Sequence, residues 1–361
     1  MSKKHGANLF ELSKQYNFDI NNILDFSSNI NPFGASRKAL DYVSENIDMV
    51  SIYPDPEYIS LKNAISGYSE CKAENIILSN GATSLISNYI KYVSPSKSLL
   101  IQPAYSEYES ELEAQGSEIC RFYLDKDSDF VIDAKKMTDF INENQIDLVI
   151  LCNPNNPTGT IVSRSDLLDI ITGTRAKFLI DETYIEFSEK DIFTSSPLTT
   201  ENPNLFVIRG TSKFFGTPGI RLGYAITSDS GAKDFINSKF NLWDINIIAS
   251  AMGEIMFTDT EYINDTFKKI SEEMKYLKSE LSRLRNLKVY PSSGNFILCE
   301  ILRSDLDASD VYGELIKKGI AIRNCSSFNG LSEKFFRICT LRHSENELLV
   351  SELEKIFNKN E

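Results

Sequence analysis

A lysine and an arginine in one short stretch have the types and spacing for covalent and anion-binding chemistry. The stretch RGTSKFFGTPGIRLGY, residues 209–224, places Lys213 in a hydroxyl-bearing turn and Arg221 eight residues later, with four glycines around the pair. An amine that is partly desolvated, or that lies beside other cations, is shifted toward its neutral and nucleophilic form. A guanidinium matches phosphate oxygens with a planar fork. The stretch therefore predicts that Lys213 forms a Schiff base with a phosphate-bearing aldehyde and that Arg221 binds the phosphate.

Two further candidates follow predicted strands, where the ligands of open α/β sheets bind. Gly81, Ala82 and Thr83 come after the run NIILSN and open a predicted helix. The free N–H groups and positive dipole at the start of a helix favour an anion such as phosphate. Tyr105 ends the run SLLIQPAY and offers a ring face on which a flat heterocycle can stack. Taken alone, the first motif is also explained by an ordinary turn before a helix, and Tyr105 is also explained by packing in the core.

Two more motifs place polar groups at strand ends. NPNNPTG, residues 153–159, predicts a tight polar loop in which Asn156 can donate a side-chain hydrogen bond. Asp181 ends the run KFLID, and Tyr184 lies three residues further on. A buried carboxylate is costly unless a cation pairs with it. Asp181 therefore predicts a cationic partner, such as a protonated ring nitrogen.

The elements that must position these residues alternate between strand and helix. From about residue 74 to 228, short aliphatic runs alternate with amphipathic segments such as SLISNYIKYVS. This pattern is typical of the α/β class, with a mainly parallel sheet covered by helices on both faces. The strand ending near Ser212 and the strand beginning near Arg221 are only about eight residues apart, whereas a parallel crossover needs a dozen or more. We therefore expect this pair to be antiparallel and the sheet to be mixed.

The pattern of alternating strands and helices is interrupted after about residue 245. A long charged helical region, residues 259–285, has periodic Ile, Phe, Met and Leu and is expected to bridge two domains. Strand runs such as NFILCEIL and helical patterns such as DASDVYGELIKKG follow and predict a smaller α/β domain. The expected limits are an N-terminal arm at 1–40 that contributes to the small domain and the active site, a large domain at 41–245 and a small C-terminal domain at 246–361.

Composition argues against several other classes of protein. The net charge of -13, without a basic cluster, argues against nucleic-acid binding. No apolar run reaches the roughly 18 residues of a membrane helix, and no apolar segment follows the first charged residues, so we expect a cytoplasmic protein. Six scattered cysteines without a C-x-x-C pair and only two histidines predict reduced thiols and no metal site.

Together, these motifs resemble the pyridoxal-phosphate enzymes of the aspartate aminotransferase fold (fold type I, class I and II aminotransferases), in particular the histidinol-phosphate aminotransferase branch. The likeness covers nearly the whole chain in the right order. It implies that Lys213 is the Schiff-base lysine and that Asp181 pairs with the pyridine nitrogen. It implies that Tyr105 stacks on the ring and that Tyr184 and Asn156 contact the ring hydroxyl oxygen. The implied phosphate ligands are the 81–83 turn, Ser212, Arg221 and, from the neighbouring subunit of a homodimer, Tyr53.

The two ends of the chain are more similar to the threonine-phosphate decarboxylases of cobalamin biosynthesis than to histidinol-phosphate aminotransferases. The similar segments are HGANLFEL, LDFSSNINPFG, IAIRNCSSFNGL and FFRICTLRHSENELL. This implies that Arg337 binds a substrate carboxylate close to Asn156. The residues implied to line the path of the substrate phosphate are Arg323, Asn29, Asn31 and His5. Both rival substrates carry a phosphate, and no motif shows whether carbon dioxide or a proton leaves the α carbon.

Two positions depart from the family pattern. Gly210 stands where relatives place a serine or threonine phosphate ligand, so the role of Thr211 is open. Leu341 stands where the family has a basic residue, with Arg342 one step on, so the substrate assignment is open too. A non-catalytic, pyridoxal-phosphate-binding gene regulator is the remaining alternative. It would need a DNA-binding module, and the residues before the enzyme-like sequence are few and not basic.

Overall fold

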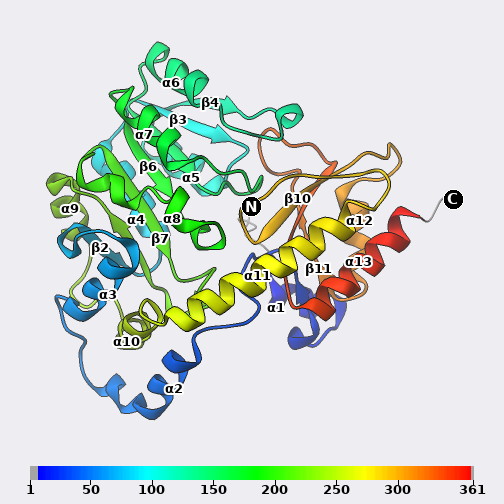
Figure 1. Cartoon of the computed structure of the whole chain (residues 1–361), viewed down its shortest axis with the longest axis horizontal. Helices are drawn as coiled ribbons and strands as arrows, with labels where there is room; N and C mark the ends of the chain where they lie inside the picture. Colours follow the sequence, from blue (N-terminus) through cyan, green and yellow to red (C-terminus); the bar gives the residue numbers. More distant parts are fainter. Residues whose placement is uncertain (1–6, 359–361) are drawn as a thin grey trace.

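A seven-stranded sheet forms the centre of the larger lobe (Figure 1). The computed structural model describes residues 7–358, and within them the strand order is β2-β8-β7-β6-β5-β3-β4. Only β8 runs antiparallel to its neighbours there, so the predicted antiparallel pair and the mixed, mainly parallel sheet are confirmed. The strands are β2 (Ile76–Ser79), β3 (Lys97–Gln102), β4 (Glu118–Tyr123), β5 (Leu148–Cys152), β6 (Lys177–Asp181), β7 (Leu205–Gly210) and β8 (Gly223–Ile226).

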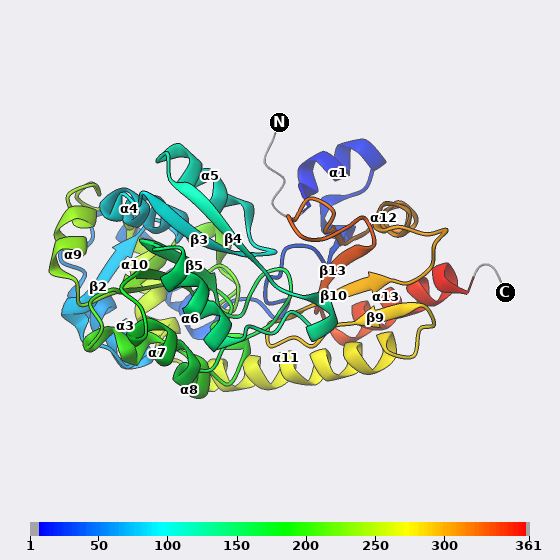
Figure 2. The ribbon, with the colours of Figure 1, turned by 90° about the horizontal axis from the view of Figure 1, so that it is seen from above.

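Helices cover both faces of this sheet (Figure 2). They include α4 (Thr83–Val93), α5 (Ser106–Ala114), α6 (Ala134–Glu143) and α7 (Arg164–Thr172). In β3, Leu100 faces a core shared with α4 and α5, whereas Leu99 faces a second core shared with α6 and α7. Strands that are buried on both faces read as continuous apolar runs, which is why the sequence predicts the central strands well.

The edge strand β4 has no counterpart among the predicted strands. Its end residues Glu118 and Tyr123 are exposed and the residues between them are half-buried. An edge strand with a partly solvated surface lacks a continuous apolar run. A segment this short also shows too few alternations of apolar and polar residues to be distinguished from a loop by its sequence.

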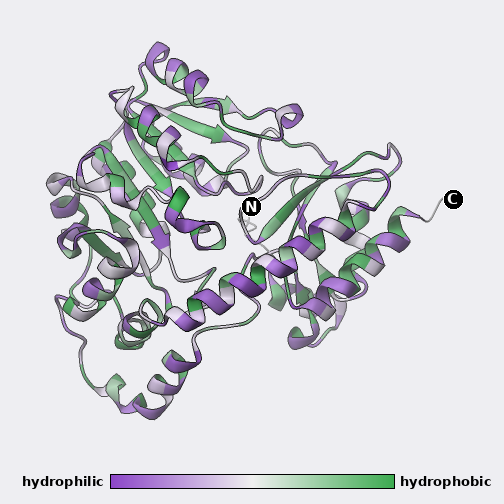
Figure 3. Ribbon diagram, viewed as in Figure 1, coloured by the Kyte–Doolittle hydropathy of each residue, from purple (hydrophilic) through white to green (hydrophobic). Residues whose placement is uncertain are grey.

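A second lobe contains a four-stranded antiparallel sheet in the order β12-β13-β10-β9. Its strands are β9 (Leu287–Val289), β10 (Phe296–Ile301), β12 (Arg323–Asn324) and β13 (Phe335–Cys339), and α12 (Ala308–Ile316) and α13 (His343–Phe357) pack beside them. The long helix α11 (Thr260–Leu281) runs along both lobes in Figures 1 and 2, and its range falls within the helical region predicted at residues 259–285. Hydrophilic and hydrophobic residues alternate along it in Figure 3. The domain limits at residues 40 and 245 stay a prediction.

The N-terminal arm connects the two lobes. β1 (Leu24–Asp25) pairs in parallel with β11 (Ile320–Ala321) of the second lobe. The chain then crosses to the large lobe, where the N–H of Asn31 donates to the carbonyl of Lys213 at 3.0 Å. The remaining α-helices are α1 (Leu9–Tyr16), α2 (Arg37–Glu45), α3 (Ile59–Ser69), α8 (Lys190–Phe193), α9 (Ser230–Asn237) and α10 (Ile247–Met256).

A buried ion pair fixes β7 against the loop after β6. Arg209 and Glu182 are both almost fully buried, and the guanidinium donates to one Glu182 carboxylate oxygen at 2.7 and 3.0 Å. The other oxygen accepts from the N–H and hydroxyl of Ser195, each at 2.6 Å. This network lies directly beyond Asp181 in the sequence, so it stabilises the strand end that carries a predicted site residue.

Arg209→Met is expected to lower the free energy of unfolding by about 3–5 kcal/mol, because it leaves the Glu182 carboxylate buried without a cation. Denaturant titration measures the change. The double variant with Glu182→Gln should recover much of the loss, since the glutamine can still accept from Ser195 without a charge. A loss below about 1 kcal/mol in the single variant, the size of an ordinary hydrogen bond, would contradict this reading of the pair.

Candidate active site

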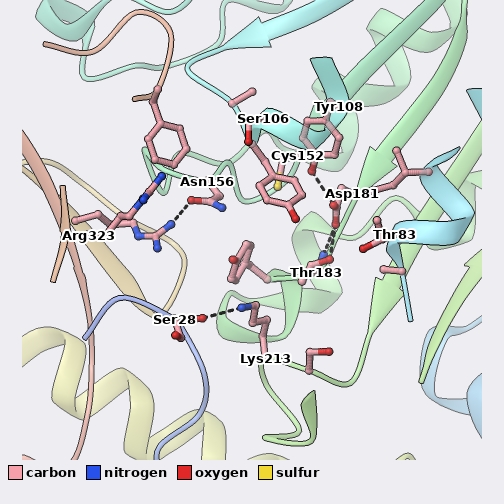
Figure 4. Close-up of a pocket in the computed structure, with 18 of the residues that line it drawn as sticks. Ser28, Thr83, Ser106, Tyr108, Cys152, Asn156, Asp181, Thr183, Lys213 and Arg323 are labelled. Carbon is pink, nitrogen blue, oxygen red and sulfur yellow. Dashed lines mark hydrogen bonds between the residues drawn. The ribbon is translucent and has the colours of Figure 1, made fainter. Parts of the chain in front are cut away.

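A cavity of about 780 Å³ lies at the carboxyl ends of β3, β5, β6 and β7, where the second lobe faces the sheet (Figure 4). Most of the predicted site residues line it. They are Ala82, Thr83, Tyr105, Asn156, Asp181, Tyr184, Ser212, Lys213, Arg221, Arg323 and Arg337. Residues more than 250 positions apart in the sequence therefore share one cavity.

The amine of Lys213 lies in this cavity, in the turn after β7. Its Nζ donates to the carbonyl of Ser28 at 2.7 Å (Figure 4). Burial and then the positive charge of Arg337 lower the pKa of Lys213 from 10.5 to about 8. At pH values above about 8 the amine is mostly neutral, which is the form that attacks a carbonyl carbon.

In cofactor-free protein, Lys213 is expected to react with a limiting amount of acetic anhydride with a midpoint near pH 8, well below that of an exposed lysine. Mass spectrometry of the labelled peptides measures this midpoint. Arg337→Met should raise it, because a neighbouring positive charge no longer disfavours the ammonium form. A Lys213 midpoint equal to that of the exposed lysines would contradict the prediction.

Asp181 ends β6 as a buried carboxylate. Its Oδ2 accepts from the hydroxyl of Tyr108 at 2.7 Å, and its Oδ1 accepts from the N–H of Thr183 at 2.9 Å and from the Thr183 hydroxyl (Figure 4). Burial raises the pKa of Asp181, although these hydrogen bonds act in the opposite direction. No Lys or Arg within residues 7–358 forms an ion pair with it, and a buried carboxylate of this kind favours a cationic ligand.

Tyr108 is a site residue that the sequence analysis missed. It lies on α5, three residues after Tyr105, and its side chain is fully buried against Asp181. The spacing PAYSEY places the two tyrosines about one helical turn apart, so the second could have been proposed as a partner for a buried acid. The sequence alone contains no signal that favours this role over core packing, which is common for a tyrosine on a buried helix face.

Tyr184 lines the same cavity, and Asn29 contacts it without lining the cavity itself. Tyr184 packs edge-on against Phe296 with ring centroids 5.1 Å apart, and burial raises the pKa of its hydroxyl to about 12. Its oxygen accepts from Nδ2 of Asn29 at 3.4 Å. The Oδ1 of Asn29 is buried without a hydrogen-bond partner among the described residues. Buried polar atoms usually have a hydrogen-bond partner, so this unsatisfied acceptor beside a lining residue is notable.

A candidate phosphate site lies between Arg221 and the start of α4. Gly81 has a left-handed φ of +91°, and a Cβ added there would lie 2.2 Å from Nη2 of Arg221, so only glycine lets the guanidinium approach this turn. Ala82 caps α4 without a side-chain hydrogen bond, which leaves the first N–H groups of the helix available to an anion. Thr211 does not compensate for Gly210, because it is buried and its hydroxyl donates to the carbonyl of Leu222 at 3.2 Å.

Two arginines from the small lobe face the cavity. Arg337, on β13, is almost fully buried and donates through Nη1 to Oδ1 of Asn156 and through Nη2 to the carbonyl of Ser27 at 2.6 Å. Its Nε is buried with no partner in the described part of the chain. Arg323, on β12, donates to the hydroxyl of Ser327 at 3.0 Å. Arg337 is buried and Arg323 is half-buried, and guanidinium groups with unused donors suit a ligand with carboxylate or phosphate groups.

Four of the predicted residues that the structure describes do not line this cavity, and Asn29, which contacts Tyr184, is one of them. Asn31 is buried, and its amide donates to the carbonyls of Gly34 and Phe214 and to the Tyr262 hydroxyl, so it anchors the arm and does not face a substrate path. Tyr53 is 75% exposed and stacks on Trp243, away from the cavity of its own chain. Gly81 packs against the guanidinium of Arg221. His5 lies outside the described residues.

The class of this chain follows from its sheet order and from the lysine, carboxylate and arginines that line its cavity. It belongs to the aminotransferase class I and II family, whose model matches residues 13–353. Enzymes of this family depend on pyridoxal phosphate. The chain is therefore an enzyme of the class I/II aminotransferase fold, as the sequence analysis predicts.

Relatives with two different activities are similar to this chain. A protein of Caldanaerobacter subterraneus subsp. tengcongensis, provisionally named a threonine-phosphate decarboxylase, is 36% identical over 99% of this chain and 94% of its own length. A histidinol-phosphate aminotransferase of Methanococcoides burtonii is 32% identical over 97% and 95%. The crystal structure of histidinol-phosphate aminotransferase from Clostridium acetobutylicum has a TM-score of 0.86 and 32% identity, covering 93% of this chain and 100% of that one.

Within residues 7–358, no helix combines the length and apolar character needed to cross a bilayer. The same residues contain no group of three or more His, Cys, Asp or Glu side chains arranged to hold a metal ion. All six cysteines are free thiols.

Proposed function

We propose that this chain binds pyridoxal 5'-phosphate through a Schiff base on Lys213. The observation that carries the proposal is one cavity that holds an amine with a lowered pKa and a buried carboxylate, Asp181, which forms no ion pair with a Lys or Arg of the described residues. A protonated pyridine nitrogen would pair with that carboxylate, and the aldehyde would react with the amine. Tyr105 would stack on the ring, while Tyr184 and Asn156 would contact its hydroxyl oxygen.

The phosphate would lie in the site formed by Gly81, Ala82, Thr83, Ser212 and Arg221. The guanidinium of Arg221 and the N–H groups of α4 supply charge and directed donors for its oxygens. When bound, the cofactor supplies an electron sink for the bond that breaks at the substrate α carbon. The residues of the chain hold it, orient the substrate and move protons.

We propose that the substrate is L-threonine O-3-phosphate and that the reaction is its decarboxylation. Arg337, whose buried Nε has no hydrogen-bond partner within residues 7–358, would bind the α-carboxylate beside Asn156. Arg323, with Asn29 nearby, would lie along the path of the phosphate, and the role expected of His5 falls outside the described residues. In this reaction the bond between the α carbon and the carboxylate breaks, carbon dioxide leaves, and the amine of Lys213 returns a proton to the α carbon.

Transamination of histidinol phosphate is the second candidate, because relatives with that name are similarly close. The experiment that separates them offers threonine phosphate and histidinol phosphate to the purified enzyme in parallel. Release of carbon dioxide from threonine phosphate without a keto acid supports the decarboxylase. Loss of histidinol phosphate only when a keto acid is present supports the aminotransferase and rejects our first choice.

We also propose that the enzyme is a cytoplasmic homodimer with no nucleic-acid partner. Exposed apolar side chains gather around Tyr53, including Ile52 (66% exposed) and Leu242 (63% exposed), and Trp243 stacks on the Tyr53 ring at a centroid distance of 4.1 Å. Apolar surface of this kind favours a protein interface, and a second copy would use it to bring Tyr53 to the phosphate site of its partner.

Tyr53→Phe is expected to weaken binding of pyridoxal phosphate by about tenfold, because one hydrogen bond from a hydroxyl to a charged phosphate is lost. Titration of cofactor-free dimer measures the affinity, and sedimentation checks that the dimer persists. Tyr123→Phe, on an exposed tyrosine of β4, is the matched control. An affinity equal to that of the control would count against the placement of Tyr53.

A further inference from the structure

Asp25 holds two serines of the N-terminal arm. It is the last residue of β1, which joins the arm to β11. Its Oδ1 accepts from the N–H of Ser27 at 2.9 Å and from the Ser27 hydroxyl at 2.6 Å, and its Oδ2 accepts from the hydroxyl of Ser28. Since each carboxylate oxygen holds a different serine, Asp25 restrains the orientation of the peptide groups of residues 27 and 28.

The carbonyl groups of the same two serines hold two cations of the cavity. Arg337 donates through Nη2 to the carbonyl of Ser27 at 2.6 Å, and Lys213 donates through Nζ to the carbonyl of Ser28 at 2.7 Å. Figure 4 shows the second of these bonds, between Lys213 and Ser28. Arg337 comes from the small lobe and Lys213 from the turn after β7, so one short segment of the arm connects a cation from each lobe.

The charge of Asp25 also acts on Lys213. Burial and Arg337 lower the pKa of the amine, whereas Cys339, Asp25 and Asp181 act to raise it. The carboxylate is therefore linked to Lys213 in two ways, by the hydrogen-bonded turn and by its field. A purely structural turn residue would provide only the first.

We propose that Asp25 is a positioning residue. Through its hydrogen bonds with the hydroxyls of Ser27 and Ser28, it orients the two carbonyls that hold the side chains of Lys213 and Arg337 in place relative to each other. The inference rests on the proposed function, in which Arg337 binds the substrate carboxylate and Lys213 moves the proton. Which bond of the α carbon breaks depends on the angle at which that carboxylate is held. A rotation of either peptide group would therefore misalign the bond that breaks and the amine that returns the proton.

The test compares Asp25→Asn with a matched control, Asp19→Asn, in the full-length chain. Asp19 lies in the same arm, and its carboxylate accepts from the N–H and side-chain amide of Asn21 without contacting Lys213 or Arg337. Two quantities are measured. The first is the pH midpoint of acetic anhydride labelling of Lys213 in cofactor-free protein, read from the Lys213 peptide. The second is kcat of the cofactor-bound enzyme on threonine phosphate and histidinol phosphate.

Asp25→Asn is expected to move the Lys213 midpoint to lower pH, because a negative charge that favours the ammonium form is lost. It should lower kcat about tenfold, the effect of losing one well-placed hydrogen bond. Asp19→Asn should change neither. An unchanged Lys213 midpoint overturns the proposal, even if thermal stability or cofactor content falls, because those changes alone describe a structural residue.

Ser28→Ala keeps the charge of Asp25 and removes one of its links, so it tests the geometry separately. It is expected to lower kcat severalfold, the effect of one lost hydrogen bond, with folding and cofactor content retained. An unchanged kcat would overturn the role given to the turn. If wild-type enzyme accepts neither phosphorylated substrate, the proposed function fails, whereas the labelling midpoint still decides whether Asp25 acts on Lys213, because that measurement needs neither cofactor nor substrate.

Discussion

Lys213→Ala is expected to lose the visible absorbance of bound pyridoxal phosphate and to lower kcat by at least about 10⁴-fold. The variant removes the amine that forms the Schiff base and also the group that carries the proton, and proton transfer alone contributes about 10²–10⁴-fold. Absorbance spectra of protein incubated with the cofactor, followed by steady-state assays, measure both effects. The loss of colour should be complete, because no other lysine lines the cavity in the described residues.

Lys190→Met is the matched control for this variant. Burial also lowers the pKa of Lys190, but its amine donates to the carbonyl of Tyr68 at 2.8 Å, outside the cavity. The control variant should therefore keep its colour and its activity for as long as it stays folded. Colour retained in Lys213→Ala, or lost in the control with its fold intact, would mean that the wrong lysine is assigned.

Asp181→Asn is expected to lower kcat by roughly 100- to 4,000-fold with the fold intact. The asparagine has nearly the same shape and can still accept from the N–H of Thr183, but it cannot balance a positive charge on the ring nitrogen. Loss of one partner of a buried charge pair costs about 3–5 kcal/mol, and each factor of ten in rate corresponds to about 1.4 kcal/mol. Steady-state kinetics at saturating cofactor separate this effect from weaker cofactor binding.

Tyr108→Phe provides a graded comparison with Asp181→Asn. It removes one hydrogen bond to the Asp181 carboxylate and leaves the charge in place, so the expected fall in kcat is about tenfold or less. If the two variants had equal effects, hydrogen bonding alone would explain the role of Asp181. The charge pairing proposed for it would then be rejected.

The sequence predicted the parts of the fold whose signals are local. The eight-residue spacing between Ser212 and Arg221 was enough to predict the antiparallel pair β7 and β8, because chain length alone excludes a parallel crossover. Buried strands such as β5 and β6 were predicted because both of their faces are apolar. The edge strand β4 was missed because half of its surface meets solvent.

The candidate site was predictable where a residue type has few other uses at a strand end. Burying a charged group costs free energy unless a partner or ligand compensates for it. Asp181, at the end of a buried strand, and Lys213, in a glycine-rich turn, could therefore be chosen from residue type and position. The links of Ser27 and Ser28 to Arg337 and Lys213 were not predictable, since they join groups 310 and 185 residues apart through backbone carbonyls. Backbone acceptors carry no residue-specific signal.

Asn31 illustrates the opposite error. It belongs to a segment, NINPFG, that resembles family members, and the sequence analysis assigned it to the substrate path. In the structure its amide is fully used by Gly34, Phe214 and Tyr262. A motif can therefore mark a segment that holds the site together as readily as one that touches the ligand.

Borohydride reduction of the wild-type protein with pyridoxal phosphate bound, followed by digestion and mass spectrometry, tests the central claim most directly. Reduction converts a Schiff base into a stable bond between the cofactor and its lysine. Because trypsin does not cleave after a modified lysine, the predicted product is the peptide spanning residues 210–221 with one phosphopyridoxyl group on Lys213. A phosphopyridoxyl group confined to other lysines, or absent from every peptide, would contradict the account.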